Sequence, residues 1–281
     1  MQIIEEISKN RINKSASGSM LQKICLDKLQ LNPLPNHKSE IWRMANKSKL
    51  ARFLDYKLNH DFYKPNIPYK NESQNVIRLI IGDNKKINIK EQEWEIKELD
   101  DQKILNLIQH KLLESDTTQN WSALLNHLLT NKKNICGLNI SGRNLPHLEI
   151  ITNSKNNLFN SRTLILNIEK NTEVEISQIN LGDDNCSLSN SSYLYLGEDS
   201  QVNHGIVSYG KYKSHLINSL NVFQNKNSVY NLGSLQFKFD FARLEININQ
   251  IEGNAKTNIK GMQITQDNEQ ISTYAKIAFN G

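Results

Sequence analysis

The sequence predicts a mostly β protein preceded by a small α-rich α+β domain. Three observations indicate this division: helical periodicity stops near Asn131, short runs of alternating apolar and polar residues follow, and polar clusters typical of turns separate several of the runs. Alternation with a period of two is typical of strands with one buried face. We therefore expect an N-terminal domain over residues 1–131 and a strand-rich core over residues 132–281.

Three helices and a hairpin are expected in the N-terminal domain. Ser17 or Ser19 can cap a first helix with an apolar face made of Leu21, Ile24, Cys25 and Leu29, and Pro33 and Pro35 end it. The β-branched run Val76–Ile81, the turn Gly82-Asp83-Asn84 and the alternating Ile87 and Ile89 predict a β-hairpin. Asp100 or Asp101 can cap a second helix, with Ile104, Leu105, Leu107, Ile108 and Leu112 on its inner side, and Trp121–Thr130 is a further helical piece.

Seven alternating runs follow: Leu164/Leu166/Ile168, Val174/Ile176, Val202/His204/Ile206, Leu216/Asn218/Leu220/Val222, Leu244/Ile246/Ile248, Ala255/Thr257/Ile259 and Thr273/Ala275/Ile277/Phe279. The turn clusters are Gly182-Asp183-Asp184, Gly197-Glu198-Asp199 and Glu252-Gly253-Asn254. Many strands without helices between them fit either an antiparallel sandwich or barrel, or a β-helix or solenoid. The spacing of the runs is irregular and indicates no fixed repeat, so the residues alone slightly favour the sandwich.

Charge and hydropathy narrow the classes of function. The 34 basic and 29 acidic side chains give a net charge of +5, and they are scattered rather than clustered, which disfavours nucleic-acid binding. No apolar run approaches the roughly 20 residues that a membrane-spanning helix needs. The N-terminus, MQIIEEISKNRINK, resembles neither a signal peptide nor a transit peptide, so we expect a cytoplasmic protein without a membrane partner.

Cysteine and histidine patterns give no metal motif. Cys25, Cys136 and Cys186 are far apart, form no Cys-x-x-Cys pair and have no histidine at zinc-finger spacing, so we expect buried or idle thiols. His110 and His127, in predicted helices, are expected to be structural or surface groups. His204 and His215 lie in predicted strands. Because His204 alternates with Val202 and Ile206, a core histidine is favoured over a metal ligand.

Two acidic pairs could suggest a β-helical carbohydrate enzyme: Asp183 with Asp184, and Glu198 with Asp199. All four residues lie at expected turns, where such side chains are favoured for backbone reasons, so we expect no catalytic residue among them. A structural or adhesive solenoid is a further alternative, against which the absence of an export signal weighs.

The segment Leu34–Leu50, LPNHKSEIWRMANKSKL, is termed the Trp42 segment below. It places one tryptophan in a polar, cationic stretch after two prolines, which is typical of an aromatic anchor that docks a short helix on its domain. The segment resembles the corresponding part of SufD, in the SufB/SufD family of the SUF iron–sulfur cluster assembly complex. Met44-Ala45 departs from the family, which usually has Tyr or Phe followed by Thr there.

Further elements resemble the same family in order along the chain: Ala123-Leu124-Leu125-Asn126, Gly137-Leu138-Asn139-Ile140, Leu145–Ile150, Leu164–Ile179, Ala242-Arg243-Leu244-Glu245, Ile251–Ala255 and Lys260-Gly261-Met262. The resemblance implies an incomplete right-handed parallel β-helix for the core, in place of the sandwich. Within it, Gly233, Gly253 and Gly261 are expected to serve turns or close backbone approach.

The resemblance also implies a function. It implies a non-enzymatic scaffold that pairs with SufB through β-helix edges and acts with the SufC ATPase while the full complex transiently assembles an Fe–S cluster. The family continues with further coils and a helical region, so we expect an N-terminal fragment, with the SufB and SufC interfaces mostly beyond Gly281. We therefore expect no catalytic residue, metal ligand or bound cofactor in this part.

Overall fold

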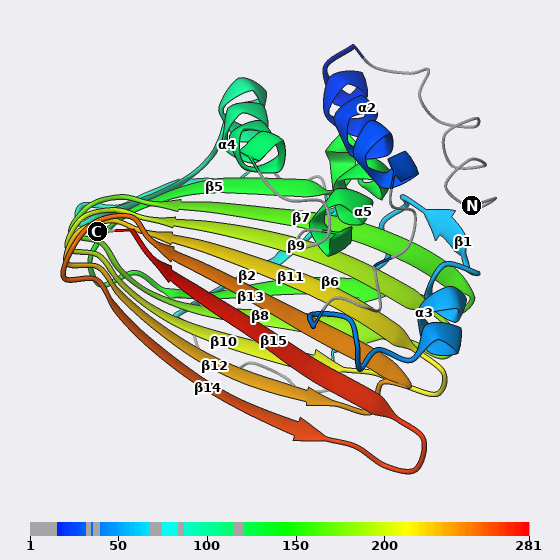
Figure 1. Cartoon of the computed structure of the whole chain (residues 1–281). Helices are drawn as coiled ribbons and strands as arrows, with labels where there is room; N and C mark the ends of the chain where they lie inside the picture. Colours follow the sequence, from blue (N-terminus) through cyan, green and yellow to red (C-terminus); the bar gives the residue numbers. More distant parts are fainter. Residues whose placement is uncertain are drawn as a thin grey trace.

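The computed structural model describes residues 16–31, 35, 40–67, 75–83, 87–114 and 121–280. Its main body is a parallel β-solenoid of about five turns, in which two long sheets face each other (Figure 1). Sheet A contains, in order across the sheet, β15 (Gln270–Phe279), β13 (Phe241–Gln250), β11 (His215–Gln224), β9 (Ser187–Leu196), β7 (Leu158–Ile168), β5 (Ile135–Gly142), β4 (Trp94–Glu98) and β3 (Asn88–Lys90), with β1 (Lys57–Asn59) also paired to β7. Sheet B contains β14 (Lys256–Ile264), β12 (Val229–Phe237), β10 (Gln201–Tyr209), β8 (Glu173–Gly182), β6 (His147–Ser154) and β2 (Val76–Ile80).

Strand pairing decides between the two architectures that the residues left open. From β5 to β15, each strand pairs in parallel with the strand one coil away, for example β9 with β7 and β11. The antiparallel sandwich that the residues alone favoured is therefore wrong. The parallel β-helix implied by the family resemblance agrees with the structure.

A regular repeat is present, but it lies in the turns. Residues 171, 185, 199, 213 and 227 all have positive φ, at a constant interval of 14 residues. Two such steps make one coil, so Ser187 pairs with both Phe159 and His215 across 28 residues on either side. The expectation of irregular spacing was wrong because it considered only the apolar runs, which start at different points within each repeat.

The interior of the solenoid holds the main apolar core. Alternate residues of both sheets meet there, including Leu166, Ile176, Leu194, Val202 and Ile246, each at most 1% exposed. The runs predicted from alternation thus supply the inward side chains. Their neighbours point outward, which positions the two outer faces of the solenoid.

The helices lie on the outer face of sheet A (Figure 1). They are α2 (Ala16–Leu31), α3 (Lys47–Phe53), α4 (Asp101–Glu114) and α5 (Trp121–Leu129), followed by the short 3₁₀ helix η1 (Lys132–Asn134). A second apolar core joins them to sheet A, with Leu124 and Leu128 packed among residues such as Phe159 and Tyr193. Among the described residues, no helix has the length and apolarity needed to cross a membrane.

The predicted hairpin of Val76–Ile81 with Ile87 and Ile89 is wrong. β2 pairs with β6 in sheet B, whereas β3 pairs with β4 in sheet A, so the two strands belong to opposite sheets. Asn84 of the predicted turn lies outside the described residues. Strands from the first 131 residues therefore extend both sheets of the solenoid.

The helix predictions are mostly confirmed. Asp100 caps α4, because its Oδ1 accepts the backbone N–H of Lys103 at 2.7 Å. Cys25 and Leu29 are buried on α2 as expected. Ser17 and Ser19 lie inside α2 rather than at its cap, so that prediction is wrong. Pro33 and the side chains of Leu21, His110 and Leu112 lie outside the described residues.

Candidate functional site

The outer face of sheet B carries an open groove of about 760 Å³. One wall is a column of polar side chains, one from each successive strand: His147, Glu175, Asn203, Asn231 and Asn258. Two positions further along the strands, the residues have no side chain or a short or flexible one: Ser177, Gly205, Gly233 and Lys260. The parallel register of the coils thus aligns polar side chains along the whole groove.

The asparagines of this wall form a hydrogen-bonded ladder. Asn231 Nδ2 donates to Asn203 Oδ1 at 2.9 Å, and Asn258 Nδ2 donates to Asn231 Oδ1 at 2.7 Å. At the other end, His147 Nε2 lies 2.9 Å from Ser177 Oγ. In such ladders the members bond to one another, which orders the amide groups along the stack of coils.

The glycines give mixed results. A Cβ at Gly233 would meet nothing within 4 Å, so the predicted turn or close approach is wrong for this residue, which lies within β12. Gly253 lies in a turn, as predicted. Gly261 approaches Ser234 closely, since a Cβ there would be 2.9 Å from Ser234 Oγ.

An apolar stripe borders the groove on its other side. Tyr209 and Phe237 lie next to each other along it, with ring centroids 5.1 Å apart and the rings tilted by 44°. On β14 the stripe is open to solvent, where Met262 is 61% and Ile264 48% exposed. A polar groove beside an exposed apolar stripe suits binding of a polypeptide surface better than bond-breaking chemistry.

His204 is a core residue, as the alternation predicted. Its Nδ1 lies 2.8 Å from the Tyr230 hydroxyl inside the solenoid, and burial lowers its pKa to about 3. His127 is likewise buried, with Nε2 2.7 Å from the Tyr193 hydroxyl and a pKa lowered by burial to about 3. Both are neutral, structural imidazoles at physiological pH.

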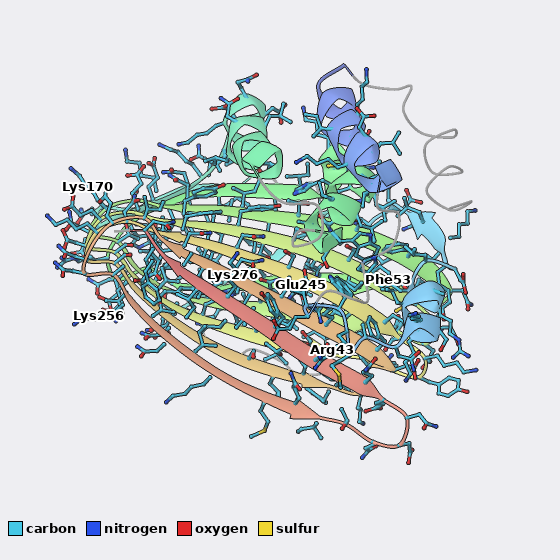
Figure 2. The ribbon with its side chains drawn as sticks, viewed as in Figure 1. Arg43, Phe53, Lys170, Glu245, Lys256 and Lys276 are labelled. Carbon is cyan, nitrogen blue, oxygen red and sulfur yellow. The ribbon has the colours of Figure 1, made fainter. Side chains whose placement is uncertain are left out.

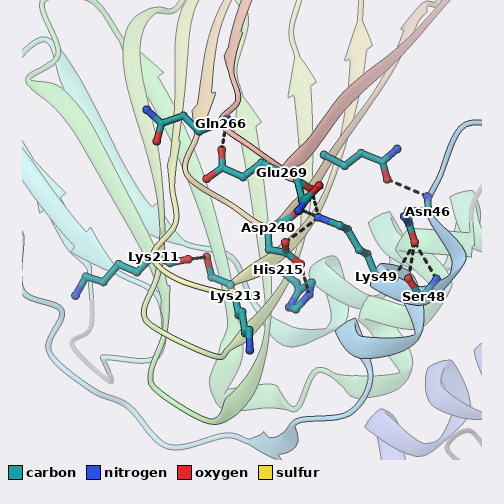
Figure 3. Close-up of polar contacts among 12 residues, drawn as sticks. Asn46, Ser48, Lys49, Lys211, Lys213, His215, Asp240, Gln266 and Glu269 are labelled. Carbon is teal, nitrogen blue, oxygen red and sulfur yellow. Dashed lines mark hydrogen bonds and ion pairs between the residues drawn. The ribbon is translucent and has the colours of Figure 1, made fainter.

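His215 lies in a polar junction at the turns that lead from sheet B to sheet A (Figure 3). Its Nε2 is 3.4 Å from Asp240 Oδ2, while Lys49 Nζ is 2.7 Å from Asp240 Oδ1. Burial lowers the pKa of His215, and the nearby carboxylate partly opposes this. Lys49 also donates to the backbone carbonyls of Asp240 and Asn268, so the junction fastens α3 to the last two coils.

The three cysteines lie apart and make no disulfide. Burial raises the pKa of each thiol to about 12, so each stays protonated near neutral pH. Cys25 and Cys186 are buried as expected, and Cys136 is half-buried. Within the described ranges, no three His, Cys, Asp or Glu side chains gather as a metal site would require.

The acidic pairs serve the turns. Asp183 pairs with Lys211 one coil away at 2.8 Å, and Asp184 Oδ1 accepts the backbone N–H of Tyr212 at 3.0 Å. Asp199 has a φ of 56° and accepts a hydrogen bond from Asn227 at 3.0 Å. These contacts agree with the predicted backbone role of the acidic pairs.

Sequence reasoning missed the buried partner of Trp42. Trp42 is 1% exposed and packs between Trp121, at 5.4 Å between ring centroids, and the guanidinium of Arg243 at 4.1 Å. Arg243 also donates to Glu245 and to the carbonyl of Ile41, each at 2.7 Å. The signal was present, since Arg243 and Glu245 alternate with the apolar run of β13 and point to the outer face (Figure 2, Glu245).

Comparison with known protein families gives a match within the solenoid. Residues 150–281 match the family model described as "SUF system FeS cluster assembly, SufBD core domain". A search of curated proteins found no match. The matched stretch runs from within β6 past the end of β15, which supports a place in the SufB/SufD family and a role in Fe–S cluster assembly.

Proposed function

We propose that the chain is a SufD-type, non-catalytic scaffold subunit of the cytoplasmic SUF system. In this role it pairs with SufB and acts with the SufC ATPase, and the Fe–S cluster is assembled by the whole complex. The carrying observation is the SufBD core-domain match across β6–β15. The Trp42 segment and the ordered motifs of the sequence favour SufD over SufB within that family.

The side chains are consistent with a scaffold. Raised thiol pKa values at Cys25, Cys136 and Cys186 disfavour thiolate ligation by these residues. Asp183, Asp184 and Asp199 are engaged in contacts between coils, which disfavours a role in general acid–base work for these three residues.

The outer face of sheet B supports a protein partner. Met262 and Ile264 on β14 are 61% and 48% exposed beside the polar groove. An exposed apolar stripe beside a polar groove suits contact with another protein surface.

The test is co-purification of the affinity-tagged full-length gene product with co-expressed SufB and SufC. We expect both proteins in the eluate, as for a known SufD run in parallel. Met262→Glu should reduce SufB recovery at least tenfold, whereas Lys170→Glu, at the exposed turn between β7 and β8 (Figure 2), should not. Failure to recover SufB where the known SufD succeeds contradicts the proposal.

A further inference from the structure

Arg162 is a buried cation inside the first coil of the solenoid. It lies on β7 opposite Asn190 of β9 and one residue before Thr163, which pairs with Ile135 of β5, and its side chain is 1% exposed. Its Nε and Nη2 make no hydrogen bond, and Nη1 makes one long contact of 3.4 Å to the carbonyl of Ser161. Burial lowers the pKa of Arg162 only to about 10, so the group stays charged at neutral pH.

The two unpaired nitrogens form one edge of the guanidinium. Nε and Nη2 carry parallel N–H groups, the fork that matches two oxygens of a carboxylate or another oxyanion. Arg243, on β13 of the same sheet, shows the contrast, because its guanidinium has Glu245 as a counterion. A buried charge without a partner costs several kcal/mol, so a bound anion at this edge would stabilise the fold.

A glycine and a second donor lie beside the fork. A Cβ at Gly82 would be 3.7 Å from Arg162 Nη2 and 3.5 Å from Asn134 Oδ1, so the absence of a side chain leaves a methyl-sized gap next to Nη2. The Tyr63 hydroxyl, buried without a hydrogen-bond partner, interacts electrostatically with Arg162. These groups come from separate segments that meet only at the base of the solenoid.

We propose that the Nε/Nη2 edge of Arg162 binds a small oxyanion of carboxylate or nitrate size, held beside Gly82 within the first coil. Two oxygens of one anion accept the two parallel N–H groups, which a spherical chloride ion cannot do equally well. The anion neutralises the buried charge and closes the base of the solenoid. This inference is independent of the proposed function.

The test compares unfolding of the purified chain in sodium formate and in sodium chloride at equal ionic strength. We expect a midpoint temperature about 5 °C or more higher in formate, at concentrations a hundredfold above its Kd. Isothermal titration with formate should show one site per chain. Equal midpoints in the two salts, with no titration heat, would mean that water alone fills the space, and would overturn the proposal.

Three variants locate the effect. Arg162→Gln should abolish the formate dependence. Asn134→Asp places a carboxylate in the same space and should raise the midpoint in chloride while removing the response to formate, so it decides the matter even if Arg162→Gln does not fold. Arg52→Gln removes an exposed positive charge and should keep the full response. A normal response in Asn134→Asp, or its loss in Arg52→Gln, contradicts the assignment.

Discussion

At the scale of single residues, the turns of the solenoid follow a local chemical rule. Each residue with positive φ at the 14-residue interval is Asn, Asp or Lys, and the next residue is Thr172, Cys186, Ser200, Ser214 or Ser228. The last four of these side chains donate to the carbonyl three residues earlier, at 2.6 to 3.0 Å. Asn and Asp tolerate the left-handed region, and the buried hydroxyl or thiol gives a turn carbonyl a side-chain donor. At Ser200, Ser214 and Ser228 the backbone N–H of the same residue bonds that carbonyl as well.

Asn171 tests the rule, because its φ of 57° is unfavourable for a residue with an ordinary Cβ. We expect Asn171→Ala to lower the free energy of unfolding by about 1 kcal/mol, and Asn171→Gly to leave it nearly unchanged. Urea denaturation measures both. At the preceding Lys170, which has no positive φ, Ala should be at least as stable as Gly. The same order of Ala and Gly at both positions would contradict the rule.

The buried imidazoles of His127 and His204 should make stability depend on pH. Burial lowers both pKa values to about 3, below the unfolded value near 6.5, so the unfolded chain binds more protons between these limits. The free energy of unfolding therefore falls as pH drops from 6.5 toward 3, by about 2 kcal/mol per imidazole at pH 5.

His127→Gln should remove about half of this dependence. The measurement is urea denaturation at several pH values, with pH 8 as the reference where both imidazoles are neutral in either state. An unchanged slope between pH 6 and pH 4 would contradict the buried, neutral assignment of His127.

At the scale of elements, the Trp42 segment and α3 hold helices and late coils together. Trp42 contacts Trp121 at the start of α5 and Arg243 on β13, and Lys49 of α3 reaches the turns before β13 and β15. Gln270 at the start of β15 adds to this attachment, since its side chain accepts a hydrogen bond from the backbone N–H of Asn46 and donates one to the carbonyl of Met44. Residues near position 45 therefore secure strands more than 190 positions later.

The buried pair of Arg243 and Glu245 tests this attachment. Arg243→Met leaves Glu245, 2% exposed, without its cation and removes the contact with Trp42, so we expect a loss of about 3 kcal/mol in chemical denaturation. Adding Glu245→Gln should recover part of that loss. The exposed pair of Lys132 and Asp101 is the control, and Lys132→Gln should cost less than about 1 kcal/mol. Equal costs at the two sites would contradict a role for buried charge.

Local patterns predicted the elements better than their partners. Alternation identified the inward residues of β7, β10 and β13. The position of Trp42 as an isolated tryptophan in a polar stretch predicted that it is buried. The hairpin failed because β2 is held by β6, more than 60 residues away, and a turn signal carries no information about that partner. The sequence did not predict the surroundings of Arg162 for the same reason, since Gly82 and Asn134 come from segments that only the coiling of the chain brings together.

At the scale of the whole molecule, the solenoid is a row of coils in which each contacts its neighbours. The row is unevenly supported. Helix α5 packs on β7, β9 and β11, whereas Trp42 and Lys49 reach β13 and the turn before β15 through single side chains. Stability in such a row is a sum of local terms, so the less supported coil can open without the rest.

Matched core substitutions should reveal this gradient. Leu166 of β7 and Leu244 of β13 are both 0% exposed in the interior, and replacement by Ala should cost about 2–5 kcal/mol at either position. In native-state hydrogen exchange, Leu244→Ala should accelerate exchange in β13, β14 and β15 while β7 and β9 stay protected. Leu166→Ala should instead lower protection in all of these strands together, because β7 is flanked on both sides and covered by α5, so that it opens only when the whole molecule unfolds. Matching exchange profiles for the two variants would mean that the solenoid unfolds as one cooperative unit and that the helical layer does not divide it.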